Sequence, residues 1–114
     1  MDRALADGAA VSGLRRLAEL YQSVEQETPF GGRSVGLEPV GVVWIEILRR
    51  RRRERSEAGV EPRKHEAIDV ESRTDPRLSV GRVLRLDGAD WRIVLIADDA
   101  PKVGRATLTL ERES

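Results

Sequence analysis

Cysteine is absent from the 114-residue sequence. Disulfide bonds, thiolate metal sites and a cysteine nucleophile are therefore excluded. Aromatic residues make up only 4% of the chain, and no apolar run approaches the roughly 18 residues that a membrane-spanning helix needs. The first residues include Asp2 and Asp7, where a signal peptide would be basic, so we expect neither a signal peptide nor a membrane partner.

Net charge is absent as well, because 20 lysines and arginines balance 20 aspartates and glutamates. Charged residues nevertheless occupy 35% of positions, against roughly 25% in an ordinary soluble domain. A general attraction of the whole chain to nucleic acid is therefore not expected. Only Lys64 and Lys102 are lysines, so nearly all basic residues are arginines, whose planar guanidinium groups suit bidentate contacts with carboxylates and phosphates.

Hydrophobic residues form 39% of the chain, which is enough for one small core. Residues 1–13 are small and polar and contain two glycines, so we expect a flexible N-terminal arm there. Residues 14–114 are expected to form a single domain.

The first part of this domain contains one ambiguous segment and one break. Apolar residues in Leu14–Glu25 recur at helical spacing, so periodicity alone favours a helix. A strand is the alternative, with Ala18 and Leu20 on the same face. Three glycines and two prolines within Thr28–Pro39 then predict a loop.

Val40–Leu48 is rich in β-branched residues and predicts a buried strand with Trp44 as its core anchor. The next segment, residues 49–64, holds eight positive and three negative side chains. We expect an exposed loop there. Loops of this length are usually functional or disordered, because an ordinary hairpin needs only about two to five residues.

The remaining sequence predicts a series of antiparallel strands. Glu66–Glu71 alternates polar and apolar residues, as does the last expected strand, Arg105–Glu111, and Asp87-Gly88 is a pair favoured in tight hairpin turns. In the strand after this turn, Trp91 shares a face with Ile93 and Leu95 and is the second expected core anchor. Five or six short strands imply a mainly β fold, namely a small antiparallel barrel or sandwich with little helix.

The sequence offers little for catalysis. His65 is the single histidine and has no second histidine or cysteine with which to share a metal, so it is interpreted as a solvated surface residue. Asp98 and Asp99 could form a carboxylate pair, but acids next to a turn are also what turn chemistry selects. Neither a glycine-rich phosphate loop nor a nucleophile with a base is recognisable. We therefore expect no enzyme activity, no metal and no cofactor.

The basic segment is the candidate functional site. It could neutralise DNA phosphates, dock on an acidic partner or remain a solvated loop. Its interleaved glutamates argue against a pure DNA-binding arm and favour contacts between copies in a ring. A small β-barrel nucleic-acid-binding module that uses this segment is the alternative function. The site residues are Arg49, Arg50, Arg51, Arg52, Arg53, Arg55, Arg63 and Lys64.

The order of motifs along the chain is informative: LRRLAELYQSVEQE, the break TPFGGRS, the strand VGVVWIEI, a long variable loop, IDVESRTD, GRVLRLDGADWRIVLIADD and ATLTLERE. In this order they resemble the head-tail joining proteins, also called head-closure or stopper proteins, of tailed bacteriophages and gene transfer agents. The most specific part is Arg82–Asp99, where the family has a strand, a glycine turn and an aromatic-led strand that ends in acids. The resemblance runs from about Leu14 to Glu113.

The resemblance implies a structural head-tail connector. Such a protein is a small β-barrel that forms a ring of about six or twelve copies under the portal and adaptor proteins. The ring closes the DNA channel and offers a surface to tail terminator or tail tube proteins, and its long basic loop would meet DNA without reading the sequence. The protein would lie in the neck of a virion or virus-like particle assembled in the bacterial host cytoplasm. The resemblance also implies a strand over Leu17–Glu25.

Overall fold

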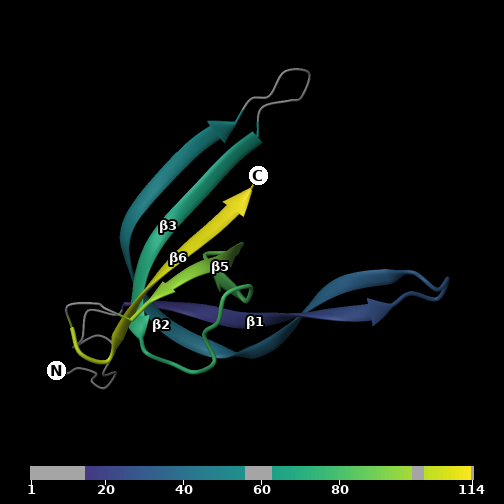
Figure 1. Ribbon diagram of the computed structural model, residues 1–114, viewed down its shortest axis with the longest axis horizontal. Helices are drawn as coiled ribbons and strands as arrows, with labels where there is room; N and C mark the ends of the chain where they lie inside the picture. The colour runs from purple at the N-terminus through teal and green to yellow at the C-terminus, as the bar shows by residue number, and fades with distance from the viewer. Residues whose placement is uncertain (1–14, 56–62, 99–101, 114) are drawn as a thin grey trace.

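The structure, a computed structural model, describes residues 15–55, 63–98 and 102–113 (Figure 1). This part of the chain contains no helix, and so no helix long and apolar enough to cross a membrane. The expected N-terminal arm, residues 1–13, lies outside the described residues, as does the segment 56–62 of the expected basic loop. The described strands are β1 (Arg16–Glu27), β2 (Arg33–Arg55), β3 (Arg63–Arg73), β4 (Val83–Leu86), β5 (Ala89–Ala97) and β6 (Arg105–Glu113).

The six strands of the described chain close into one antiparallel barrel in the order β1-β2-β3-β6-β5-β4. β1 completes the ring of strands by pairing with β4 across Glu19–Tyr21. Closure lets a small sheet bury one face and protect its strand edges. The predicted fold class, a mainly β small antiparallel barrel with little helix, is confirmed.

Aliphatic side chains and one tryptophan fill the interior of the barrel and form its core. Trp91 on β5 is 3% exposed and lies opposite Leu84 of β4. Because successive side chains of a strand point to opposite faces, each strand contributes every second residue to the core. The large side chains that are fully buried are Leu20, Ile45, Ile68, Val70, Leu84, Ile93, Leu108 and Leu110.

β1 is a strand throughout. Ala18 and Leu20 are buried in the core, and Arg16–Glu27 pairs along its length with β2. The helical interpretation of Leu14–Glu25 is therefore wrong, and the strand implied for Leu17–Glu25 by the family resemblance is confirmed. Pairing with β2 and β4 satisfies the backbone of β1 in the sheet, and this tertiary context outweighs local apolar spacing.

The predicted loop over Thr28–Pro39 is wrong for its second half, where β2 has already begun. Pro39 is accommodated at a bulge, where the register between β1 and β2 shifts, because proline lacks the N–H that a regular ladder requires. The turn itself is closed by a 2.8 Å hydrogen bond from the Thr28 amide to the Gly32 carbonyl. Gly31 has a φ of +80°, a conformation that favours glycine.

The hairpin predicted at Asp87-Gly88 joins β4 to β5 and is confirmed. Both turn residues have positive φ, +52° and +78°, as a type I′ turn requires. Further along β5, a bulge between Ile93 and Leu95 leaves Leu95 exposed, and Ile96 packs against the core instead. The prediction that Leu95 shares the inward face with Trp91 and Ile93 is therefore wrong. One extra residue in a strand reverses the side to which every later side chain points.

Two β-ribbons project from the barrel, toward the right and the top of Figure 1. The first, here called the β1–β2 arm (residues 22–38), lies beyond the short β1–β4 pairing, so in the described chain its strands pair only with each other. The second, the basic hairpin (residues 49–55 and 63–69), is formed by β2 and β3, and β6 pairs with β3 along His65–Asp69. The Cα radius of gyration is 16.6 Å, above the roughly 13 Å of a compact chain of this length.

Candidate functional site

The basic segment is a pair of strands rather than a loop. The expected exposed loop over residues 49–64 is wrong where the chain is described, because β2 continues to Arg55 and β3 begins at Arg63. Cross-strand pairing explains the difference. The register places Arg49 directly opposite Asp69 and Arg52 directly opposite Glu66. Opposite charges that face each other across a sheet stabilise the strand pairing.

Asp69 is the acidic centre of the outer face of the basic hairpin and is only 9% exposed. Arg49 donates to its Oδ2 from Nη2 at 3.0 Å and from Nε at 3.2 Å, and Arg51 donates from Nη2 to Oδ1 at 2.9 Å. The Thr109 hydroxyl on β6 donates to the same Oδ1 at 3.0 Å. Burial alone would raise the pKa of Asp69, but these hydrogen bonds and the positive charges outweigh it and lower the pKa.

The stability of the fold is expected to depend on pH through Asp69. Because the pKa of Asp69 is lower in the folded state, its ionised form stabilises the fold above the ordinary value of 3.8, and this contribution is lost as the pH falls through the folded-state value. Urea denaturation between about pH 6 and about pH 2.5 should show a steeper loss of stability for the wild type than for Asp69→Asn. Equal pH dependence in the two proteins would contradict this prediction.

On the opposite face of the hairpin, Glu66 connects the arginine run to the barrel. Its carboxylate accepts a hydrogen bond from Arg112 Nη2 at 2.9 Å, and Arg52 Nε lies 3.7 Å from it. The Arg112 guanidinium in turn lies over the Trp91 ring, 5.0 Å from the ring centroid, in a cation–π contact. The run is therefore anchored to the core through a chain of charged and aromatic contacts.

The predicted basic site residues divide into two described groups. Arg49, Arg51 and Arg52 are engaged by acids of β3. Arg50 is exposed and, among the described side chains of the run, is the one that forms no ion pair. The predicted residues whose backbone lies in the strands but whose side chains lie outside the described residues are Arg53, Arg55, Arg63 and Lys64.

The residues considered for catalysis are not assembled into a site. The His65 side chain is 18% exposed rather than fully solvated, and its Nε2 lies 3.5 Å from Glu111 Oε1. Asp98 is exposed, and Asp99 lies outside the described residues. Within residues 15–55, 63–98 and 102–113, no group of three His, Cys, Asp or Glu residues is placed to hold a metal ion.

The two predicted core anchors lie in different environments. Trp91 lies in the core, whereas Trp44 is half-buried and outside it. Val43 and Ile45 are the buried residues on either side of Trp44, so the indole points to the outer face of the barrel. The prediction for Trp44 is wrong, because a strand that is apolar at nearly every position does not reveal from sequence which alternate residues face inward.

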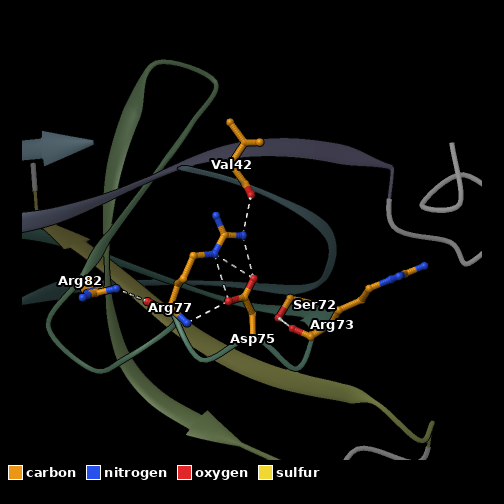
Figure 2. Close-up of polar contacts among 6 residues, drawn as sticks. All are labelled: Val42, Ser72, Arg73, Asp75, Arg77 and Arg82. Carbon is orange, nitrogen blue, oxygen red and sulfur yellow. Dashed lines mark hydrogen bonds and ion pairs between the residues drawn. The ribbon is translucent and has the colours of Figure 1, made fainter. Parts of the chain in front are cut away.

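Sequence reasoning missed a clamp at the end of β3 that lies away from the basic hairpin. Figure 2 shows Arg77 between Asp75 and the backbone of Val42: its Nη2 donates to Asp75 Oδ2 at 2.7 Å and to the Val42 carbonyl at 3.1 Å. The Arg77 amide also donates to Asp75 Oδ1 at 2.8 Å. These hydrogen bonds lower the pKa of Asp75 and raise that of Arg77. The spacing Asp-Pro-Arg was the available signal, because an aspartate that bonds the backbone two residues later is a common turn.

A cavity of about 560 Å³ lies beside this clamp. Its lining is mixed: the apolar residues Pro76, Leu78, Val80, Ile96 and Ala106 lie beside the polar residues Thr74, Asp75, Ser79 and Asp98. Two carboxylates, Asp75 and Asp98, therefore lie among its apolar residues. Nothing in the sequence pattern indicated this cavity, since its lining comes from three separate segments of the chain.

The described chain is thus a small closed β-barrel with two projecting ribbons, an ion-paired arginine strand and a cavity beside the Arg77 clamp. No protein-family model and no curated protein matches the sequence. The fold is similar to a chain in a solved structure described as the virion of a native gene transfer agent particle, with a TM-score of 0.69 and 21% sequence identity. The match covers 89% of this chain and 96% of that chain. At this identity the likeness shows a shared fold.

Proposed function

We propose that this protein is a structural component of a phage or gene-transfer-agent virion and, within it, a head-tail connector of the stopper type. The observation that carries the proposal is the match of nearly the whole fold to a chain of a gene transfer agent virion. The ordered motifs that resemble head-tail joining proteins support the same role. In this role, copies form a ring under the portal and adaptor proteins, close the DNA channel and bind the tail terminator or tail tube.

The two ribbons suit a subunit of a ring. They extend the molecule to 54 Å along its longest axis (Figure 1), so each copy reaches well past its own barrel. One ribbon can then contact a neighbouring copy while the other approaches the channel. Contacts that are weak in one pair become strong when the geometry lets every copy make them at once.

The basic hairpin is the part of the subunit that we place toward the channel. The Arg49 and Arg51 side chains are 66% and 42% exposed although both bind Asp69, and Arg50 is exposed on the same strand. Phosphates attract such arginines through counterion release, without dependence on base sequence. Repetition around a ring would give the channel a band of guanidinium groups that holds DNA non-specifically.

The same ion pairs weigh against the alternative of a nucleic-acid-binding module that acts alone. Such a module must hold nucleic acid with a single copy, but in one copy the charges of Arg49, Arg51 and Arg52 are partly neutralised by carboxylates of β3. A ring adds this weak attraction over all of its copies. Fluorescence anisotropy with duplex and single-stranded DNA at physiological salt separates the two functions. The connector role predicts weak, salt-sensitive binding by the isolated protein.

The direct test of the connector role is assembly on its neighbours. Purified protein should be monomeric or weakly associated alone and should form a ring when it is mixed with the portal–adaptor complex of the same particle. Sedimentation and negative-stain electron microscopy report both properties. Failure to sediment with that complex would count decisively against the connector role.

Substitution of Arg50 tests the channel-facing hairpin. Arg50→Glu should leave the free energy of unfolding within about 0.5 kcal/mol, because the side chain is exposed and not in an ion pair. It should nevertheless lower the yield of DNA-filled particles. Arg15→Glu is the matched control, since Arg15 is also exposed and without an ion pair in the described chain. Equal particle yields from the two variants would contradict the placement of the basic hairpin in the channel.

A further inference from the structure

The inner face of the basic hairpin carries three arginines around one carboxylate. Arg50 lies directly opposite Ile68, a core residue, so it is on the face that lines the barrel interior. Two residues farther along the strands, on the same face, Arg52 lies opposite Glu66, and Glu66 lies opposite Arg112 of β6. We call these four charged residues the inner arginine cluster: Arg50, Arg52, Glu66 and Arg112.

Within the inner arginine cluster, Glu66 is engaged mainly by Arg112. Its Oε1 accepts a hydrogen bond from Arg112 Nη2 at 2.9 Å, whereas Arg52 Nε lies 3.7 Å from Oε2, too far for a hydrogen bond. The Arg52 side chain is 86% exposed, and Arg50 is exposed and forms no ion pair. These two guanidinium groups therefore keep their N–H donors available to a ligand.

The inner arginine cluster has more positive than negative charge. Three arginines surround one glutamate, so its local net charge is +2. Arg16 and Asp87, which lie where β1 begins and where β4 has ended, bind each other at 2.6 Å and add no net charge. Arg112 Nε is buried and has no hydrogen-bond partner among the described residues. A single carboxylate thus leaves the guanidinium groups incompletely satisfied, and such groups attract a further anion.

We infer that the inner arginine cluster is a nucleic-acid site, in which Arg50 and Arg52 bind phosphodiester groups of the DNA backbone and Glu66 limits how tightly they do so. The inference rests on the proposed function, because the DNA channel brings this polyanion to the basic hairpin. Guanidinium groups bind phosphate oxygens through paired hydrogen bonds, and such contacts carry no sequence information. Arg50 and Arg52 are two residues apart on an extended strand, or roughly 7 Å. A backbone with successive charges can contact both, whereas one carboxylate of a protein surface meets only one.

Glu66 offers a test in which the affinity rises. Glu66→Gln keeps a side-chain acceptor for Arg112 and removes the negative charge beside Arg52. It should therefore tighten the binding of duplex DNA by at least about threefold, because the phosphate no longer meets a carboxylate of the same charge. Glu25→Gln is the matched control: Glu25 also accepts a hydrogen bond from an arginine, Arg33, at 2.9 Å, but lies on the β1–β2 arm. A merely destabilised protein would not gain affinity.

Replacement of both ligand-binding arginines tests the same site by loss. Fluorescence anisotropy with a labelled duplex between about 50 and about 200 mM salt compares Arg50→Gln with Arg52→Gln against the wild type. The double variant should bind at least about tenfold more weakly at the lowest salt. The slope of log affinity against log salt should fall in magnitude by at least about 0.9, the value for one phosphate contact. Circular dichroism checks that the variant is folded.

The control for this loss is Arg33→Gln with Arg73→Gln. It removes the same charge, and it likewise combines one exposed arginine in an ion pair with one exposed arginine that has none in the described chain. Arg33 lies on the β1–β2 arm and Arg73 at the end of β3 away from the basic hairpin. The control should therefore keep its affinity within about twofold and its salt slope unchanged.

Three results would overturn the inference. They are equal losses of DNA affinity from the two double variants, a Glu66→Gln protein that binds no tighter than Glu25→Gln, and labelled polyglutamate that binds as tightly as DNA of equal charge. The last result would assign the inner arginine cluster to an acidic protein partner. Sedimentation with the portal–adaptor complex separates this inference from the connector role. A wild type that assembles there while any of these results holds refutes the DNA site alone, whereas failure to assemble refutes the connector role.

Discussion

Replacement of Trp91 by alanine is expected to lower the free energy of unfolding by about 3–5 kcal/mol, the usual loss for a large aromatic side chain in a core. Trp91 is 3% exposed and lies opposite Leu84. The change also removes the ring over which the Arg112 guanidinium lies. Urea denaturation followed by circular dichroism at neutral pH measures the loss.

Trp44→Ala is the matched control for this prediction. Trp44 is half-buried on the outer face of the barrel, so its replacement should cost only about 1 kcal/mol. The two tryptophans differ in position and not in chemistry, so the comparison isolates the effect of facing the core. If both variants lost the same amount of stability, the assignment of inner and outer faces in β2 or β5 would be wrong.

Replacement of Arg105 by methionine is expected to destabilise the fold by about 3 kcal/mol, because it leaves a buried carboxylate without its main partner. Arg105 Nη1 donates to Glu71 Oε1 at 2.7 Å, and both side chains are about nine-tenths buried. Among the described residues, a second ion pair of Glu71 is formed by Lys102, whose Nζ lies 3.8 Å away and whose side chain is mostly exposed. Denaturation at pH 7 tests the prediction.

A double variant distinguishes the loss of the pair from the loss of packing. In Arg105→Met with Glu71→Leu, two apolar side chains replace the buried ion pair, and such replacements are often neutral or stabilising. The double variant should therefore recover most of the stability that Arg105→Met loses. A double variant as unstable as the sum of the single variants would show that Arg105 and Glu71 act independently.

Local patterns in the sequence predicted much of the fold. The Asp87-Gly88 turn was readable because its backbone conformation selects those two residues. The last strand was readable because Ala106, Leu108 and Leu110 alternate with polar residues, and all three are buried. These features depend on residues within one strand or one turn, where the physical cause lies in the local sequence.

Features that depend on the partner strand were not predictable. The arginine run extends β2 because Asp69 and Glu66 lie across from it, and the sequence alone gives no register. The bulges at Pro39 and after Ile93 change which side chains face the core, yet a bulge leaves no trace in an alternation pattern.

The candidate site was predicted in part. The concentration of arginines from Arg49 to Arg53 was evident from the sequence. Asp69 and Glu66, whose carboxylates bind several of these arginines, were predicted to lie in a strand but not to face the arginines. The Arg77 clamp was missed because one of its acceptors, the Val42 carbonyl, belongs to a strand far away in the sequence.

The proposed connector role is tested most directly by looking for this protein in the neck of a phage or gene-transfer-agent particle. A cryo-electron-microscopy reconstruction of the particle neck should contain the six-stranded barrel, repeated as a ring around the channel axis between the adaptor and the tail. The basic hairpins should point toward the DNA. A neck without this barrel, or a protein found only as single copies on DNA, would contradict the connector role.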